Sequence, residues 1–587
     1  MPDDKIKHAA PVPPFVKFVA SAVPMVFDNS LSYYEALCAL WKFIQDDVIN
    51  VINNNANVTE EYINLVDELK TYVENYFANL DVQEEINNKL DAMVEDGTFL
   101  TLITPIVQDD MATLTAEINA TKDEADSTLA QCTTLNNKAD KVLARSINSV
   151  RKAMYPRFTE FNLPVNITDT FFNDFEILSN NEGKYVVNFD ETKYINQGGS
   201  TYYIAVDGVN NLTTNDGSYE KPWMSLNYAM NRITAGDTII LKDGLYSRQN
   251  IQLSETGDKI TKSVNILAEH KGSVYLTTAD YDYTWLQNDT YSDVYEVTRS
   301  NVRRVLDITR ISENIFLDLE NVSSLQACHE TENSWYQSGS TCYVHMYDGV
   351  TPSPDNIILG LQTGQSPIVC GSFADDAKIY IKDINIIEGD KSGITCNSNG
   401  ENVTIFIDNV DVYNISCSGY ARDGFSNIGC KSICRNVHMG NIGKDGFNYH
   451  EYGTTHQQAI GIEIDCSCFN TGYGETTSSH LSNNATTAHE SSQVVRVNGL
   501  YGYANGSVIA DVNSVNSVCL GCEAMDGYGT YNYDVLCQTD SIMYLYDCNF
   551  VGSRAGYNLV TSGDNAHIYY NANTTFDTKI GNVSPIA

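Results

Sequence analysis

The sequence predicts a mainly β protein in which residues 201–587 form a parallel β-helix, a solenoid of short strands, closed by a C-terminal cap. The first observation is a repeated triplet, Asp-Gly-Phe, at 423–425 and again at 445–447, each preceded by a basic residue. Segments rich in Val, Ile, Tyr and Thr alternate here with clusters of Gly, Asn, Asp and Ser, which is typical of strands and turns.

The second observation is a loose repeat of apolar positions. Ile384, Val410 and Val437 each follow an Asp or Asn and lie 26 and 27 residues apart, and Cys522 and Cys548 lie 26 residues apart. One coil per repeat, burying its apolar face only against its neighbours, is the solenoid arrangement. Equivalent residues of successive coils would then lie one strand spacing apart, roughly 4.8 Å.

The N-terminal part has a different character. Residues 1–30 are rich in proline and are expected to form an extended arm. From Leu31 onward, apolar residues recur at helical spacing, which predicts a compact helical module over 31–100.

A coiled-coil neck is predicted within 101–150. Apolar and small residues alternate at spacings of three and four from Met111 to Val142, with no Pro or Gly between them, which is typical of a heptad repeat. A long helix packed within one chain is the alternative. The next segment, 151–200, contains several phenylalanines and is expected to be a small packed neck or linker.

The start of the solenoid carries a recognisable motif. A strand-like run at 202–208 is followed by Lys221-Pro222-Trp223, a short helical pattern and the run Gly236-Asp237-Thr238-Ile239. This region, 202–246, resembles the opening of pectate-lyase-like right-handed β-helices. The resemblance implies that a Pro-Trp turn and a helix cap the first coil. It indicates fold and says little about function.

The order of arm, helical module, heptad helix and β-helix resembles the tail spikes and tail fibres of tailed phages. Segment 31–99 also resembles the N-terminal segments of tail proteins from phages of Gram-positive bacteria. The resemblance implies a homotrimer in the virion tail, assembled in the host cytoplasm, whose N-terminus docks on a tail or portal-proximal protein. Its β-helix would bind or cleave a host cell-surface glycan. One departure is that no long C-terminal chaperone domain follows the β-helix, so trimerisation would rest on the neck and the coils.

Charge and cysteine content narrow the partners. The formal net charge of −39 argues against nucleic acid and against anionic membrane surfaces, and no membrane insertion is expected. A polyanionic substrate would need a local basic patch or bridging cations.

The 15 cysteines show no paired spacing and no cleavable leader precedes them, so we expect no disulfides, no metal site and no cofactor.

Candidate site residues gather between positions 423 and 490. Asp423 and Asp445 would be adjacent on one face, where mutual repulsion makes one carboxyl hold its proton more tightly, as acid–base chemistry on a glycosidic bond requires. Alternatively, Asp-Gly is a turn dipeptide that the repeat reuses. The other candidate catalytic residues are His450, Glu451, His489 and Glu490. The candidate substrate-binding residues are Glu463 and Arg496.

Two function classes follow. The first, which the acidic and histidine cluster favours, is a polysaccharide depolymerase, either a glycoside hydrolase or a lyase. The second is a tail fibre that binds the same glycan without cleaving it. A third class, a free bacterial pectin-type lyase, would carry a leader peptide and no heptads. The sequence argues against this class, because it shows heptads and no recognisable leader.

The unslipped heptads predict a parallel trimer, with the number of strands taken from the family resemblance. Sedimentation of the full chain at micromolar concentration is expected to give a trimer. A stable monomer would contradict this prediction.

Overall fold

The computed structural model describes residues 158–180, 183–312, 315–415, 422–473, 482–529, 531–550, 552 and 556–586. They belong to one compact unit, Pro156–Ala587. The arm, the helical module and the coiled coil predicted for 1–30, 31–100 and 101–150 lie outside the described residues. None of the helices in the described ranges is long and apolar enough to cross a membrane.

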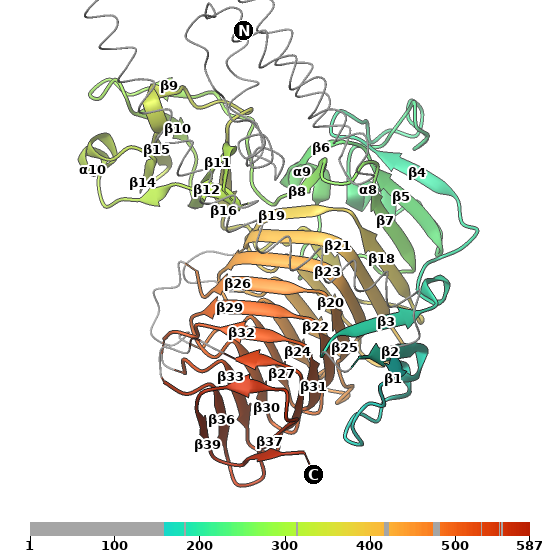
Figure 1. Cartoon of the computed structure of the whole chain (residues 1–587). Helices are drawn as coiled ribbons and strands as arrows, with labels where there is room; N and C mark the ends of the chain where they lie inside the picture. Colours follow the sequence, from blue (N-terminus) through green and yellow to red (C-terminus); the bar gives the residue numbers. More distant parts are fainter. Residues whose placement is uncertain are drawn as a thin grey trace, which may run out of the picture. The chain divides into compact units, whose positions relative to one another are not determined.

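Parallel strands stacked coil upon coil make up most of this unit (Figure 1). One sheet, which we call the front sheet, takes one strand from each coil from residue 368 onward, and all its neighbours pair in parallel. Its strands are β17 (Ile368–Cys370), β20 (Ile394–Asn397), β22 (Phe425–Ile428), β24 (Phe447–His450), β27 (Thr486–His489), β30 (Ile509–Val512), β33 (Val535–Gln538), β36 (Leu559–Ser562) and β39 (Lys579–Ile580).

Two further ladders complete each coil. The flank ladder consists of β4 (Thr201–Ile204), β5 (Asp237–Leu241), β7 (Val264–Ala268), β18 (Lys378–Lys382), the first halves of β21 (Thr404–Ile415) and β23 (Lys431–Ile442), β25 (Ile460–Ile464), β28 (Gln493–Val497), β31 (Asn516–Leu520), β34 (Ile542–Tyr546), β37 (His567–Tyr570) and β40 (Val583–Pro585). The back ladder consists of β6 (Gly244–Tyr246), β8 (Val274–Leu276), β19 (Asn385–Gly389), the second halves of β21 and β23, β26 (Ser467–Thr471), β29 (Leu500–Ala504), β32 (Glu523–Met525), β35 (Asn549–Phe550) and β38 (Thr575–Phe576).

The long parallel sheets and the mainly β character agree with the predicted β-helix-like fold. The two sequence repeats describe one interior row, because Val410 pairs with Val437 and the register then carries the row through Cys466 to Cys522 and Cys548. The right-handed sense of the winding stays a prediction.

Asparagine and aspartate hold the corner between the flank and back ladders. Asp383, Asn409, Asn436, Asp465 and Asn498 all have φ between 51° and 60°. This left-handed conformation costs these two residue types less than most others, because their short side chains hydrogen-bond locally. The corner therefore explains why each apolar position of the repeat follows an Asp or Asn.

The first coil matches the motif at 202–246. Trp223 is buried, its ring stacks on Tyr202 at a centroid distance of 5.0 Å, and its indole nitrogen donates to the carbonyl of Asn215. The short helix α8 (Leu226–Met230) follows, capped by the Ser225 hydroxyl. A second short helix, α9 (Arg248–Ile251), lies after β6.

An antiparallel insertion between β8 and β17 interrupts the solenoid. The sequence analysis did not predict this insertion. The solenoid resumes directly, since β18 pairs with β7 and β19 with β8. The insertion has its own apolar core, which includes Val305, Trp335 and Leu359. Its elements are β9 (Leu286–Gln287), β10 (Tyr295–Thr298), β11 (Val302–Ser312), β12 (Ile315–Asp318), β13 (Glu320–Asn321), α10 (Leu325–Glu330), β14 (Ser334–Ser338), β15 (Thr341–His345) and β16 (Ile357–Leu361).

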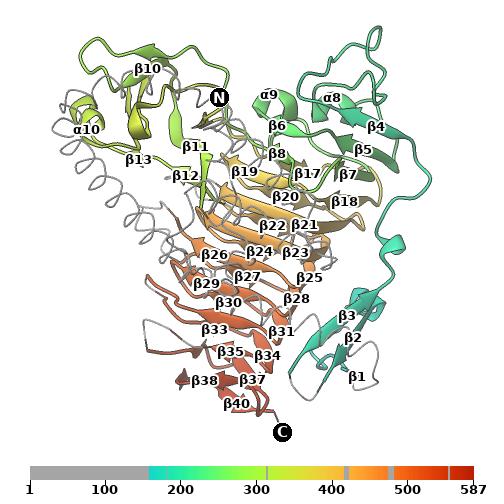
Figure 2. The same cartoon turned by 45° about the horizontal axis from the view of Figure 1, so that its top comes forward.

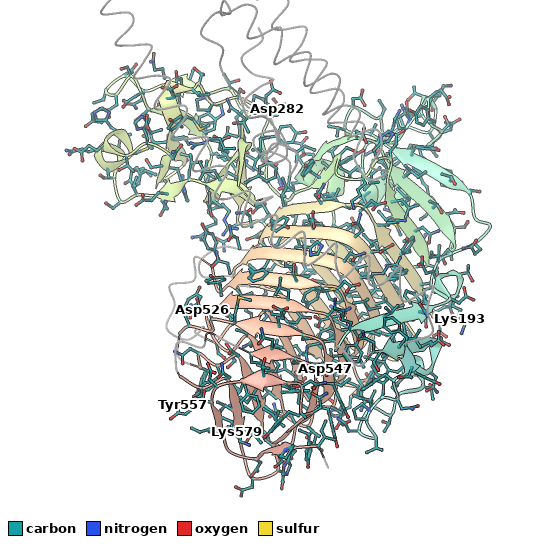
Figure 3. All side chains as sticks on the ribbon, in the orientation of Figure 1. Lys193, Asp282, Asp526, Asp547, Tyr557 and Lys579 are labelled. Carbon is teal, nitrogen blue, oxygen red and sulfur yellow. The ribbon has the colours of Figure 1, made fainter. Side chains whose placement is uncertain are left out.

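The phenylalanine-rich segment packs along the solenoid. Its small antiparallel sheet of β1 (Thr159–Glu160), β2 (Phe175–Ser179) and β3 (Tyr185–Phe189) shares one apolar cluster with outward-facing residues of the flank ladder. Figure 3 labels Lys193 in this segment and Asp547, whose carboxylate accepts a hydrogen bond from the Tyr185 hydroxyl. The outer face of the flank ladder is thus covered.

All 12 cysteines in the described ranges are buried and free of disulfides. Cys328 and Cys342 pack in the insertion between β8 and β17, and the other ten pack as small apolar residues inside the solenoid. The Sγ atoms of Cys396 and Cys430 are 3.3 Å apart, a hydrogen-bonding contact between thiols.

The Asp-Gly-Phe repeat has a packing explanation. Phe425 and Phe447 are register partners in the core. Neither Gly424 nor Gly446 has a positive φ. A Cβ at Gly424 would lie 2.5 Å from the Met439 sulfur, and one at Gly446 would overlap the Cys468 sulfur. Glycine is therefore needed here because the coil interior approaches closely.

Gly446→Ala is expected to destabilise the solenoid by about 1–3 kcal/mol through overpacking. Chemical denaturation measures this free energy of unfolding. Gly453→Ala is the matched control, because no atom lies within 4 Å of a Cβ there. Equal stability of both variants would contradict the packing explanation.

Candidate functional site on the front sheet

Asp423 and Asp445 lie one coil apart, as predicted. The Gly424 amide donates to the Asp445 carbonyl at 2.8 Å, so the register of β22 and β24 extends back to the two aspartates. Lys444 lies between their carboxylates, with Nζ 3.3 Å from Asp423 Oδ1 and 3.1 Å from Asp445 Oδ2. The two carboxylates therefore share one face and one ammonium group.

The two aspartates have different environments. Asp445 is 2% exposed, and burial raises its pKa, with Lys444 opposing the rise and the charge of Asp423 adding to it. Its carboxylate also accepts from the amide of Asn484 at 2.7 Å and from Asn448 Nδ2 at 3.1 Å. Burial is the first cause of the raised pKa of Asp445, ahead of the repulsion by Asp423 that the sequence analysis expected.

Asp423 keeps free acceptor capacity. It is 5% exposed, and its Oδ1 makes no hydrogen bond, only the ion pair with Lys444. Asp445, mainly, raises the pKa of the Lys444 ammonium, so Lys444 stays protonated at neutral pH. Asp423 is thus the carboxylate of this pair that can accept hydrogen bonds from a ligand.

A polar row lies beside the pair on the outer face of the front sheet. Thr395, Ser426, Asn448 and Thr487 occupy equivalent positions on β20, β22, β24 and β27, which follow one another along the sheet (Figure 2). Side chains alternate along a strand, and the neighbouring Phe425 and Phe447 point into the core.

Several buried polar atoms of this face have no hydrogen-bond partner among the residues that the structure describes. Thr395 Oγ1 and Asn448 Oδ1 are buried without a hydrogen bond, as is Asn397 Oδ1 at the end of β20. Each such atom costs about 1–3 kcal/mol unless a partner is supplied. Buried polar groups in native proteins are normally satisfied, so these atoms, with Asp423 Oδ1, have hydrogen-bonding capacity left for a ligand or for water.

Three further candidate residues meet at the far end of β24 and β27. The rings of His450 and His489 stack at a centroid distance of 4.1 Å and an interplanar angle of 5°, and His450 Nδ1 lies 3.0 Å from Glu490 Oε2. Burial, followed by the charge of His450, lowers the pKa of His489 to about 4.

Glu490 is held by its histidine neighbour. Burial alone would raise its pKa, but the hydrogen bond and the charge of His450 lower it. One donor atom from each of His450, His489 and Glu490 lies within 4.8 Å of the others, a spacing that a metal ion can bridge. A metal lies near the plane of each imidazole that binds it, and parallel stacked rings share no such point. In this arrangement the cluster is not a formed metal site.

Glu451 lies next to this cluster but faces other partners. Its Oε1 is 2.7 Å from His456 Nδ1, and its Oε2 accepts from the Ser491 hydroxyl at 2.9 Å. Its backbone amide donates to Glu490 Oε2 at 3.4 Å. Glu451 is therefore placed to orient Glu490 and the loop around Ser491.

Glu463 and Arg496, expected to bind substrate, lie inside the solenoid instead. Both are 0% exposed. Arg496 forms a two-pronged ion pair with Asp511 at 2.9 and 3.2 Å, and Thr486 Oγ1 links it to Glu463 at 2.8 Å. The strand register turns these side chains inward, so they hold one another and do not reach the surface.

Sequence reasoning missed the residues that satisfy or surround the aspartates. Lys444 stood out only as the basic residue before the second triplet. Thr395 and Asn448 gave no signal on their own. The alternation in Phe447-Asn448-Tyr449-His450 could have placed Asn448 and His450 on the outer face.

Comparison with known proteins shows likeness at the level of fold. No protein-family model matches the sequence, and no curated protein matches it. Among solved structures, the chain is similar to XylC in complex with xylose, at 11% identity and a TM-score of 0.41, over 65% of this chain and 70% of that one. It is similar to pectate lyase Pel9A, at 14% identity and a TM-score of 0.28, over 66% and 81%.

A third similar structure is the tailspike Gp54 of Acinetobacter baumannii bacteriophage AP22 in complex with capsular saccharide. The identity is 12% and the TM-score 0.19, over 59% of this chain and 64% of that one.

The buried position of Arg496 yields a prediction. Arg496→Met leaves two carboxylates buried without their cation, so we expect a loss of about 3–5 kcal/mol in the free energy of unfolding. Denaturation measures the loss. A variant with unchanged stability but weakened glycan binding would instead restore Arg496 as a substrate-binding residue.

Proposed function

We propose that this protein is a phage tail spike that attaches the virion to the host and cleaves a host cell-surface polysaccharide or wall glycopolymer. The glycan lies across the outer face of the front sheet, between the Asp423–Asp445 corner and the His450–His489 stack. The observation that carries the proposal is the group of buried polar atoms without a hydrogen bond on this face, Thr395 Oγ1, Asn448 Oδ1 and Asp423 Oδ1. Glycans supply dense hydroxyl groups, which are both donors and acceptors.

Residue roles follow from the two environments. Asp423, with free lone pairs, acts as base or nucleophile, and Asp445, whose pKa is raised, supplies the proton to the leaving oxygen. His450, with Nδ1 at Glu490, presents Nε2 toward the glycan. Two carboxyl groups favour a hydrolase over a lyase, because Lys444 is protonated and paired and cannot act as a base. The reaction needs no cofactor.

The proposal also covers the oligomeric state of the protein and its attachment to the virion. The protein forms a homotrimer through the neck at 101–150, docks on a tail or portal-proximal virion protein through residues 1–100, and is located in the virion tail after assembly in the host cytoplasm. These parts rest on the sequence pattern and on the resemblance to tail spikes. Because the N-terminal residues 1–100 face the virion in this proposal, the glycan site lies on the outer side of the virion.

A glycan-binding tail fibre without activity is the second candidate. One observation favours it: Lys444 already contacts both aspartates, and Asp445 also accepts hydrogen bonds from Asn448 and from the amide of Asn484. The same unsatisfied face would then hold an intact glycan.

The decisive variant is Asp423→Asn. It keeps the shape of the side chain and removes the carboxylate, so release of oligosaccharides from host wall polysaccharide should fall by about 100-fold or more. Asp564→Asn, at an exposed position, is the matched control and should cleave as the wild type does. Normal cleavage by Asp423→Asn, or no cleavage of host glycan by the wild type, would refute the enzyme. Retained adsorption of the wild type to host cells would then support the fibre.

A further inference from the structure

Three basic residues form a column at the corner that leads into the front sheet. Ile394, Phe425 and Phe447 are register partners, and the residues three positions before them are Lys391, Arg422 and Lys444. The corner keeps this register, because the Gly393 amide donates to the Asp423 carbonyl and the Gly424 amide to the Asp445 carbonyl. Successive members of the column are therefore one coil apart, roughly 4.8 Å.

The column is local. The equivalent residues in the coils before and after it are Gln365 and Asn483, both uncharged. Three stacked cations are unusual in a chain with 36 basic and 75 acidic residues. Like charges at this spacing repel one another, and the carboxylates of Asp423 and Asp445, which both contact Lys444, offset part of this repulsion.

The column adjoins the site. Lys444 contacts both Asp423 and Asp445 and is 34% exposed, and Arg422 is exposed to solvent. An acidic residue is adjacent in sequence to each member: Asp390, Asp423 and Asp445. Asp390 accepts from the backbone amides of Thr363 and Gly364, so its lone pairs are partly used elsewhere. Lys391 and Arg422 make contacts of their own as well, and both side-chain types carry several hydrogen-bond donors.

We infer that the glycan of the proposed function is anionic, that Lys391 and Arg422 bind its charged groups beside the reacting bond, and that Lys444 adds its positive charge to the column. This inference rests on the proposed function and names the chemical class of its substrate. A guanidinium and two ammonium groups suit phosphodiester or carboxylate oxygens, and arginine can bind either in a two-pronged manner. The column is the local basic patch that a polyanion needs on a protein of net charge −39.

The position of the column also gives it a role in orientation. A charged group held at Lys391 and Arg422 fixes one sugar at the corner, and the neighbouring sugar then lies over Asn448 and Asp423. The adjacent carboxylates would repel an anion placed directly on them, so the charged group and the reacting bond belong to different sugars. The column thus binds the charged group of the sugar next to the bond that the site cleaves.

The test measures binding of purified host wall glycopolymer to full-length protein in the non-cleaving Asp423→Asn background. Three forms of the polymer are compared: untreated, with phosphate removed by hydrofluoric acid, and with carboxyl groups reduced to alcohols. The variants are Lys391→Gln, Arg422→Gln and the pair together. Lys378→Gln, exposed on β18, is the matched control. Thermal unfolding checks that every variant is folded.

We expect each column variant to bind the untreated polymer roughly tenfold more weakly and the control to bind normally. Loss of binding after phosphate removal identifies a phosphodiester, and loss after carboxyl reduction identifies a uronic acid. Binding should also weaken as the salt concentration rises from about 50 mM to about 500 mM, since salt screens exposed charges.

The inference is overturned if the column variants bind the untreated polymer as tightly as Lys378→Gln does, or if neither treatment of the polymer weakens binding. The column would then serve only to neutralise the adjacent aspartates. Because binding is the readout, failure of cleavage by the wild type would refute the enzyme and leave this result standing.

Discussion

In-register stacking of one coil on the next is the constraint on which the rest of the structure depends. From β17 to β38, each coil gives one strand to the front sheet and one to each of the other ladders, and parallel hydrogen bonds join equivalent residues. A residue type that recurs at the coil period therefore becomes a row. Buried rows such as Val410, Val437 and Cys466 form the core, and outward rows form surfaces. The chemistry of the site is built from outward rows.

Three rows meet on the front sheet, each with a different role. The Asp423–Asp445 row supplies carboxylates, the Thr395–Asn448 row supplies unsatisfied hydrogen-bonding atoms, and the Lys391–Lys444 column supplies positive charge. Beyond β27 the outer face becomes apolar, with Ala510, Leu536 and Val560 packed together. The polar part of the face thus has a boundary. Figure 3 labels Asp526 and Tyr557 near the corner of these later coils, at the opposite edge of the view from Lys193.

The sequence allowed the solenoid to be predicted because its signals are local and repeated. Asp or Asn before an apolar residue marks a left-handed corner, and the Asp-Gly-Phe triplet marks a place where the interior comes close. The pairing of Asp423 with Asp445 followed from the same register. The inward direction of the Glu463 and Arg496 side chains could not be predicted in this way. In a sequence, charged residues that pair inside the core cannot be distinguished from charged residues on the surface. The antiparallel insertion was missed because short alternating strands look alike in both kinds of sheet.

The central claim is that the glycan occupies the polar part of the front sheet. A crystal structure of the Asp423→Asn variant with bound host wall oligosaccharide tests it most directly. The account predicts sugar hydroxyls within hydrogen-bonding distance of Thr395 Oγ1 and Asn448 Oδ1, with one sugar beside residue 423. An oligosaccharide bound elsewhere, for example in the hollow of about 600 Å³ lined by Asp207, Glu269 and Tyr281 between the first coil and the insertion, would contradict it.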